Sequence, residues 1–252
     1  MIHFVGAGPG APDLITVRGM RLIEEADVII YTGSLVNPEL LGYAKKNPEI
    51  YNSATMTLEE VMEVMLTSDS VGKNIVRLHT GEPSIYGAVR EQMDVLDENH
   101  RTYDSTPGVS ACFGAAATLN IEYTLPGVSQ TLIVTRMEGK TPVPEKESIE
   151  SLAAHKASMA IYLSSGMLGE LSRRLICGGV APHAPAAIVY KATWPEEKAF
   201  VCTVETLEKT ADENGIRKTA VVLVGDAVTH SSYDRSKLYD PGFATEFRDN
   251  TR

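Results

Sequence analysis

The feature that most constrains this chain is a unit that occurs three times in its first half. Each unit is a predicted strand, then a glycine-containing loop, then a helical pattern, and the loops span residues 6–13, 78–87 and 105–112. Strand–loop–helix repeats are typical of a parallel sheet covered by helices, and such sheets bind ligands at the carboxyl ends of their strands. We therefore expect the three loops to lie at one edge of one sheet and to form one site.

Hydrophobic periodicity supports this order in the first half of the chain. Apolar runs at residues 2–6, 28–31 and 75–78 predict buried strands. Helices are predicted over 14–26, behind the capping box that begins at Thr57, and over 89–96.

The second half contains a different pattern. Strands are predicted at residues 131–134, 159–163, 186–190, 200–204 and 220–224, and helices at 147–154, 169–176 and 205–214. Residues 193–197 have the composition of a hairpin turn, which introduces antiparallel pairing. We expect an α/β protein of two α/β domains, residues 1–118 and 119–252, with a mostly parallel N-terminal sheet and a mixed C-terminal sheet.

Composition excludes several classes of function. The net charge is −10, with 23 basic and 33 acidic residues and no basic run, which disfavours a nucleic-acid partner. No apolar run approaches the roughly 20 residues of a membrane-spanning helix, and the N-terminus does not resemble a signal peptide. The three cysteines are scattered and the histidines lack the spacing of metal ligands. We expect a cytoplasmic protein with no membrane partner and no protein-bound metal.

The glycine-rich opening, Gly6-Ala7-Gly8-Pro9-Gly10, allows a nicotinamide-dependent oxidoreductase as one interpretation. Dinucleotide sites usually carry a third glycine and an acidic residue after the second strand, where it binds a ribose. Here the third glycine is absent, and the second strand ends in Tyr31-Thr32. The oxidoreductase remains an alternative, but the spacing argues against it.

The three loops, in their order and spacing, resemble those of the tetrapyrrole (corrin/porphyrin) methylases, and the resemblance extends over nearly the whole chain. Residues 31–36, 135–144 and 192–197 are most similar to the branch that methylates C-11 of precorrin-4 or cobalt-precorrin-4 in cobalamin biosynthesis. The resemblance implies transfer of a methyl group from S-adenosylmethionine, with S-adenosylhomocysteine as product, to a ring carbon of a tetrapyrrole. Another corrin position, or a non-catalytic tetrapyrrole carrier, remains an alternative.

The resemblance also implies a homodimer that binds the donor in a cleft between the two domains. The donor contacts carried over are Pro9, Thr80, Gly81, Glu82, Ile85, Ser110, Ala111, Leu163 and Ala192. Two positions depart from the family pattern. Glu82 stands where the family usually has aspartate, and Thr32 stands where the uroporphyrinogen methylases carry an aspartate.

A methyl group on a sulfonium is already activated, so the reaction requires positioning rather than a metal or a covalent nucleophile. Methylation of a pyrrole carbon leaves positive charge on the ring, which the loss of a proton neutralises. Asp104 and Tyr86 are the candidate catalytic residues near the third and second loops. The substrate carries carboxylates, and Arg136 is our first choice to bind one, ahead of Arg77, Arg90, Lys140 and Lys191.

Overall fold

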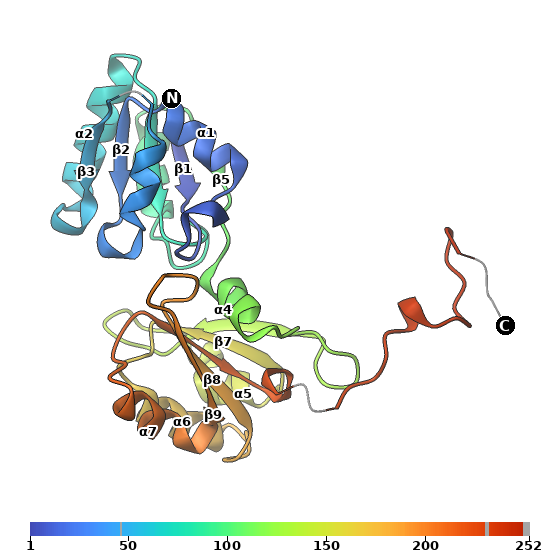
Figure 1. Cartoon of the computed structure of the whole chain (residues 1–252). Helices are drawn as coiled ribbons and strands as arrows, with labels where there is room; N and C mark the ends of the chain where they lie inside the picture. The colour runs from blue at the N-terminus through green and yellow to red at the C-terminus, as the bar shows by residue number, and fades with distance from the viewer. Residues whose placement is uncertain (46, 230–231, 249–252) are drawn as a thin grey trace. The chain divides into compact units, whose positions relative to one another are not determined.

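The computed structural model describes residues 1–45, 47–229 and 232–248 of the chain (Figure 1). It divides into two compact units. Unit 1 comprises Met1–Gly114 and Lys191–Glu197, and unit 2 comprises Ala115–Tyr190 and Lys198–Arg252. A short segment from the second half of the sequence therefore belongs with the first half. The division of the chain between residues 118 and 119 stays a prediction.

Unit 1 contains a five-stranded parallel sheet, as its strand–loop–helix repeats predict. Its strand order is β3-β2-β4-β1-β5, and every neighbouring pair is parallel. The strands are β1 (Ile2–Gly6), β2 (Val28–Tyr31), β3 (Glu49–Asn52), β4 (Ile75–His79) and β5 (Tyr103–Thr106). Hydrophobic periodicity missed β3, because this edge strand is short, mostly exposed and carries only one aliphatic side chain.

Four helices follow these strands: α1 (Val17–Glu25), α2 (Leu58–Ser70), α3 (Arg90–Glu98) and α4 (Ala111–Leu119). The helix predicted from residue 14 begins later, at Val17. Leu14 ends a separate 3-10 turn, and the Thr16 side chain then accepts a hydrogen bond from the Gly19 N–H and caps α1. The capping box predicted at Thr57 is present, with Glu60 as its second member.

Each face of the parallel sheet has its own core. On one face, Val5, Ile29 and Leu78 pack with Ile23 of α1. On the other face, the core contains the side chains of Phe4, Ile30, Ile75, Met65 and Leu96, the last two from α2 and α3. Fully burying one such side chain stabilises a fold by about 1.5–3 kcal/mol. Because both faces are covered, only the edges and the loops of this sheet are available to a ligand.

Unit 2 contains a mixed five-stranded sheet, which confirms the predicted fold class. The order is β6-β7-β10-β8-β9, with β6 parallel to β7 and the other neighbouring pairs antiparallel. The strands are β6 (Leu132–Arg136), β7 (Ser158–Tyr162), β8 (Pro185–Tyr190), β9 (Lys198–Thr203) and β10 (Ala220–Val224).

The helices of unit 2 are α5 (Ile149–Ala153), α6 (Leu168–Cys177) and α7 (Leu207–Glu213). Their apolar side chains, including Ile149, Leu171 and Leu207, form one core with Ile161 and Val222 of the sheet. Gly215 follows α7 with a φ of +67°, the left-handed conformation typical of a glycine that ends a helix. Within the residues that the structure describes, we find no helix long and apolar enough to cross a membrane.

Candidate functional site

The three glycine-containing loops of unit 1 lie against one another through their backbones. The N–H of Gly81 donates to the Gly8 carbonyl at 2.9 Å, and the Gly8 N–H donates back to the Gly81 carbonyl at 3.3 Å. A Cβ atom on Gly108 would lie 2.0 Å from the carbonyl oxygen of Gly81, and one on Gly6 would lie 2.5 Å from the Cα of Gly108. No other residue type fits these two positions, so the sequence pattern follows from backbone-to-backbone packing.

Glu82 ties the second loop to the third. One carboxylate oxygen accepts the Ser84 N–H at 3.0 Å, and the other accepts the Gly108 N–H at 2.8 Å. Burial raises the pKa of Glu82, but the hydrogen bonds from Ser84 and Gly108 outweigh that effect and lower it overall. Glu82 is therefore an ionised residue that orders the loops, and the longer side chain found here in place of aspartate reaches both of its partners.

The second loop contains a strained turn that buried polar side chains support. Tyr86 and Ala88 have φ values of +56° and +49°, which non-glycine residues rarely adopt. The Gln92 amide donates to the Ala88 carbonyl at 2.9 Å and accepts the Arg77 Nε–H at 2.9 Å. Arg77 is only 5% exposed, and burial lowers its pKa to about 10. The prediction that Arg77 could bind a carboxylate of the substrate is therefore wrong, because its guanidinium is buried inside unit 1.

His79 ends β4 immediately before the second loop. Its ring stacks on Phe4 with centroids 6.0 Å apart, and only 2% of the residue is exposed. Burial and the neighbouring Arg77 lower its pKa to about 3, so the ring is neutral at physiological pH. Its Nε2 atom has no hydrogen-bond partner among the described residues. The neutral ring acts as a packing element beneath the loops.

The segment Lys191–Glu197, which we call the hairpin tip, connects β8 to β9 and belongs to unit 1. The Thr193 hydroxyl accepts the Ala11 N–H at 3.0 Å, and the Trp194 indole N–H donates to the Pro9 carbonyl at 3.0 Å. The turn that the sequence predicts only as a hairpin therefore also forms hydrogen bonds with the glycine-rich loop.

These contacts decide between two interpretations of the glycine-rich opening. A dinucleotide site presents free loop N–H groups and a helix N-terminus to a pyrophosphate. Here the N–H groups of Ala7, Gly8 and Ala11 all bind protein oxygens, and α1 begins only at Val17. The loop is therefore built to present a closed backbone surface, and the pyrophosphate interpretation is not supported.

The structure brings most of the predicted donor contacts together. Unit 1 contains eight of the nine: Pro9, Thr80, Gly81, Glu82, Ile85, Ser110, Ala111 and Ala192. A Cβ atom on Gly81 would lie 3.7 Å from the Ser110 Cα, so these two loops adjoin directly. The hydroxyls of Thr80 and Thr32 are 3.2 Å apart, which links the second loop to the end of β2.

The ninth predicted contact, Leu163, lies in unit 2 directly after β7. Its side chain is 65% exposed and its φ is +53°. An exposed leucine in a left-handed conformation is energetically unfavourable without a further role, and such strain often marks functional positions. Its contact with the donor stays a prediction.

The three candidate catalytic residues lie in different surroundings. Asp104 lies within its strand and not in the third loop. It is the second residue of β5, and its carboxylate is 2.7 Å from the His3 Nδ1. Tyr86 is 45% exposed at the strained turn of the second loop. Arg136 ends β6 in unit 2.

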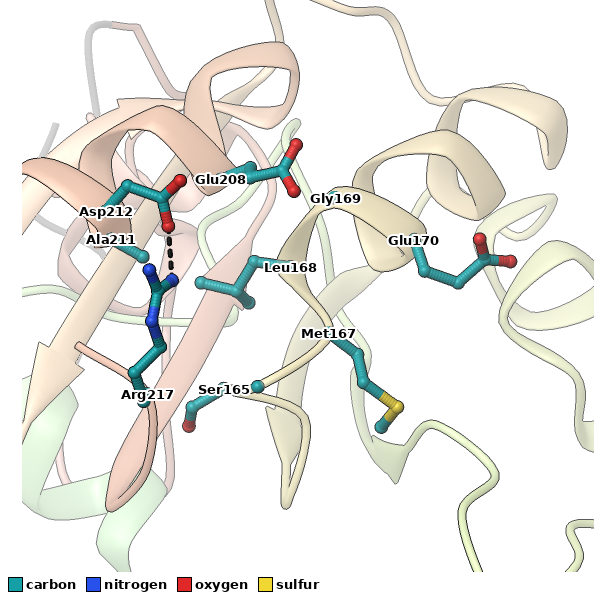
Figure 2. Close-up of a pocket in the computed structure, with 10 residues that line it drawn as sticks. Ser165, Met167, Leu168, Gly169, Glu170, Glu208, Ala211, Asp212 and Arg217 are labelled. Atoms are coloured by element: carbon teal, nitrogen blue, oxygen red, sulfur yellow. Dashed lines mark hydrogen bonds and ion pairs between the residues drawn. The ribbon is translucent and has the colours of Figure 1, made fainter. Parts of the chain in front are cut away.

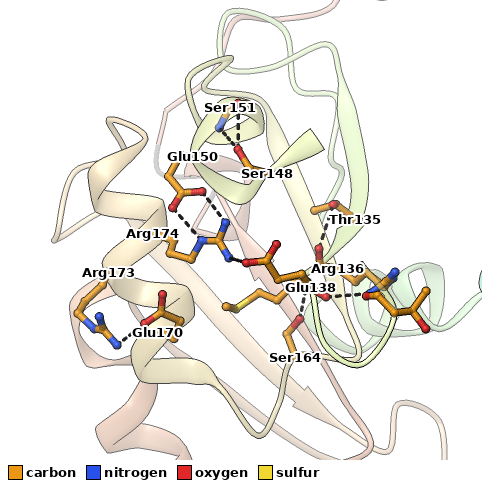
Figure 3. Close-up of polar contacts among 12 residues, drawn as sticks. Thr135, Arg136, Glu138, Ser148, Glu150, Ser151, Ser164, Glu170, Arg173 and Arg174 are labelled. Carbon is orange, nitrogen blue, oxygen red and sulfur yellow. Dashed lines mark hydrogen bonds and ion pairs between the residues drawn. The ribbon is translucent and has the colours of Figure 1, made fainter. Parts of the chain in front are cut away.

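The Arg136 guanidinium closes the loop that follows β6 (Figure 3). It donates to the carbonyls of Met137, Thr141 and Pro142 at 3.0–3.1 Å. Arg174 holds the same loop from α6, because it binds Glu138 at 2.9 Å and forms two bonds to Glu150 at 2.8 and 2.9 Å. The loop at residues 137–142 is therefore held by two arginines.

The comparisons with known proteins agree with this geometry. Residues 1–208 match the family model of the Tetrapyrrole (Corrin/Porphyrin) Methylases. The chain belongs to the tetrapyrrole methylase family. It is 51% identical to the cobalt-precorrin-4 C(11)-methyltransferase of Methanocaldococcus jannaschii over 98% of this chain and 95% of that protein. It is 40% identical to the precorrin-4 C(11)-methyltransferase of Pseudomonas aeruginosa over 94% of each.

A solved structure of a cobalt precorrin-4 methyltransferase, a cobalamin biosynthetic enzyme, has a TM-score of 0.88 to this structure. The two are 44% identical, over 90% of this chain and 95% of that one. The resemblance to the tetrapyrrole methylases found in the loop sequences is thereby confirmed.

A separate hollow of this methylase lies between α6 and α7 in unit 2 and has a volume of about 340 Å³, including open solvent (Figure 2). It is lined by Glu170, Glu208 and the ion pair of Asp212 with Arg217. None of the candidate site residues lines it, so its acidic rim is not a candidate for the methyl donor or for an anionic tetrapyrrole. No cluster of three metal-ligating side chains occurs in the described part of the methylase.

Sequence reasoning missed two buried polar residues of the methylase site, Gln92 and Asn37. The Asn37 amide donates to the Gly10 carbonyl at 2.9 Å, while its oxygen accepts the Glu39 N–H at 3.0 Å. The Asn-Pro pair at residues 37–38 does signal a helix cap, and Asn37 caps the 3-10 helix Pro38–Tyr43. Nothing in the sequence signals the second contact, because its partner is 27 residues away.

Proposed function

We propose that this protein transfers a methyl group from S-adenosylmethionine to C-11 of cobalt-precorrin-4 in cobalamin biosynthesis. The observation that carries the proposal is the set of three loops joined through their backbones, with Ala192 brought to them by the hairpin tip. The 51% identity to a cobalt-precorrin-4 C(11)-methyltransferase supports the acceptor and the carbon, and favours the cobalt form over metal-free precorrin-4.

The residues at the loops suit a donor recognised by shape and backbone groups. Pro9, Gly81 and Ser110 are buried, and Ile85 and Ala111 are partly buried and uncharged. S-adenosylmethionine supplies a methyl group on a positively charged sulfur that is already activated toward carbon. The contribution of the chain is to hold donor and acceptor in line, which can supply about 7–11 kcal/mol of the barrier.

The product ring must lose a proton, and we propose Asp104 or Tyr86 as the acceptor. The Asp104 carboxylate is half exposed and hydrogen-bonded to His3, so the pair can pass a proton to solvent. Glu82 is excluded from this role because both of its oxygens are engaged in ordering the loops. Arg136, whose guanidinium also closes the loop at residues 137–142, is proposed to bind a carboxylate of the acceptor.

A homodimer in the cytoplasm is part of the proposal. Five large apolar side chains near the C-terminal end, at positions 233, 238, 239, 243 and 247, are between 45% and 90% exposed. Exposed large apolar side chains are often covered in a protein interface, and in the proposed dimer a second copy covers these. Light scattering would measure the mass, and a monomer would contradict this part.

The reaction itself is tested by incubating the purified protein with S-adenosylmethionine and cobalt-precorrin-4, with precorrin-4 in parallel. We expect one added methyl group by mass spectrometry, at C-11 by NMR with a labelled methyl, and faster turnover of the cobalt form. A methyl group at another carbon would support the alternative within the family. Binding of NADH in place of S-adenosylhomocysteine would contradict the proposal.

A further inference from the structure

The hairpin tip is a rigid turn that places Ala192 between two strained residues. Lys191 and Thr193 have φ values of +47° and +69°. Within the tip, the Trp194 N–H donates to the Lys191 carbonyl at 3.0 Å, and the Thr193 N–H donates to the Glu197 carboxylate. Two left-handed non-glycine residues, separated by a single residue, persist only where surrounding contacts impose them.

The side chain of Trp194 packs directly against the glycine-rich loop. A Cβ atom on Gly10 would lie 2.2 Å from the Cδ1 of the indole ring, so the ring occupies the volume that any other residue at position 10 would need. The indole N–H also binds the Pro9 carbonyl, and the Lys191 ammonium lies 5.2 Å from the ring centroid. Gly10 is therefore required by the tryptophan and not by the path of the backbone, since its φ is not in the left-handed region.

Three side chains, from two parts of the sequence, thus fix residues 9–11. Trp194 binds the Pro9 carbonyl, Asn37 binds the Gly10 carbonyl and Thr193 binds the Ala11 N–H. A loop with glycines at positions 6, 8 and 10 is intrinsically mobile, and ordering each residue on binding costs entropy. With these contacts in place, the loop is already ordered when the ligand arrives.

We propose that Trp194 is a positioning residue for the methyl donor, which fixes Pro9 and Gly10 relative to Ala192 and so sets donor affinity. This inference rests on the proposed function, in which Pro9 and Ala192 contact S-adenosylmethionine. Trp194 acts through these residues and not on the reacting atoms. Its loss should weaken donor binding while the rate at saturating donor and the KM for the acceptor stay nearly unchanged.

The first experiment measures the Kd for S-adenosylhomocysteine by calorimetry and steady-state kinetics in the wild type and in Trp194→Phe, which keeps a ring but loses the indole N–H. Freeing one or two backbone residues predicts about a 10- to 100-fold weaker Kd. The donor KM should rise in parallel, with kcat within about twofold. A Trp194→Phe protein that binds S-adenosylhomocysteine as tightly as the wild type would overturn the inference.

A double-mutant cycle tests the contact directly. Gly10→Ala alone should weaken donor binding strongly, because its Cβ collides with the indole ring. In the Trp194→Ala background the same Gly10→Ala change should have little further effect, because the ring is gone. Gly42→Ala, at a glycine of unit 1 with open space around it, is the matched control and should leave donor affinity unchanged. Additive losses at positions 10 and 194 would overturn the inference.

Fluorescence of the wild type keeps the test valid if a variant does not fold, because Trp194 is the only tryptophan in the chain. Saturation with S-adenosylhomocysteine should change the Trp194 emission. If calorimetry shows binding while the emission stays unchanged, the inference about Trp194 is overturned and the proposed function is not. Failure of the wild type to bind S-adenosylhomocysteine at all would overturn the proposed function together with this inference.

Discussion

The two five-stranded sheets differ in strand direction, and that difference determines what each can assemble. In unit 1 all strands run the same way, so the loops after β1, β4 and β5 emerge at one edge and pack through Gly6, Gly81 and Gly108. In unit 2 three of the four neighbouring pairs are antiparallel, so β9 and β10 run opposite to β6, β7 and β8, and the loops that follow the strands are divided between two edges.

The loops are also stabilised differently in the two units. The loops of unit 1 are joined to one another by backbone packing and by the Glu82 carboxylate, and the side chains of Asn37, Thr193 and Trp194 hold the first of them. The loop at residues 137–142 in unit 2 is held by the side chains of Arg136 and Arg174. A site built from backbone tolerates almost no change at its glycines, whereas a loop held by long side chains should tolerate partial loss of its contacts.

The largest expected effect is that of Gly108→Ala in unit 1. Its Cβ would lie 2.0 Å from the Gly81 carbonyl oxygen, so one of the loops must move. We expect loss of S-adenosylhomocysteine binding by calorimetry and a stability loss at or above about 3 kcal/mol, the upper end for overpacking. Gly139→Ala, at an open position of unit 2, is the control and should change neither quantity. Retained binding in Gly108→Ala would contradict the backbone-packed site.

The second-largest effect is expected for Glu82→Ala, which removes the carboxylate that links the second loop to the third. The variant loses bonds to the N–H groups of Ser84 and Gly108, and we expect a loss of about 1–2 kcal/mol, since the partly exposed carboxylate is solvated on one side. Urea unfolding followed through Trp194 reports on unit 1, where that residue lies.

The pH dependence of this effect follows from the lowered pKa of Glu82. A carboxylate whose pKa is lower in the folded state stabilises the protein above its unfolded pKa of about 4.3 and loses that effect as pH falls through the folded value. The stability difference between wild type and Glu82→Gln should therefore be largest at neutral pH and shrink in acid. A difference that grows in acid would show that the carboxylate is not the ordering group.

A smaller and unit-specific effect is expected for Arg136→Gln. The change removes bonds to three carbonyls of the loop that follows β6, so faster hydrogen exchange should appear in peptides covering residues 137–142. Donor affinity should stay within about twofold of the wild type, because the predicted donor contacts lie mostly in unit 1. Arg173→Gln, which removes an exposed side chain paired with Glu170 on α6, is the control. Donor binding weakened about tenfold or more would contradict the separation of roles between the two units.

The smallest expected effect is that of Arg90→Ala in unit 1. Arg90 binds Asp94 and Asp97 on the exposed surface of α3, and exposed ion pairs contribute little to stability. We expect no measurable shift of the unfolding midpoint and no change in acceptor KM. A marked rise in acceptor KM would show instead that Arg90 binds a carboxylate of the substrate, as considered from the sequence.

Local patterns in the sequence determined the elements and their class. The apolar runs and the capping box at Thr57 predicted most of the helices and strands, because each signal depends on neighbours within a few residues. The sequences of the three glycine-containing loops indicated the tetrapyrrole methylase family. The short edge strand β3 was missed because its four mostly exposed residues carry little hydrophobic pattern.

Only the tertiary structure decided which polar groups meet. Arg77 is inside the fold with Gln92, and Asp104 pairs with His3, because strand register selects partners that are distant in sequence. The tip at Trp194 belongs with a loop 185 residues earlier in the chain. A sequence fixes periodicity and turn chemistry locally, but it does not specify long-range contacts of this kind, which arise from how the whole chain packs.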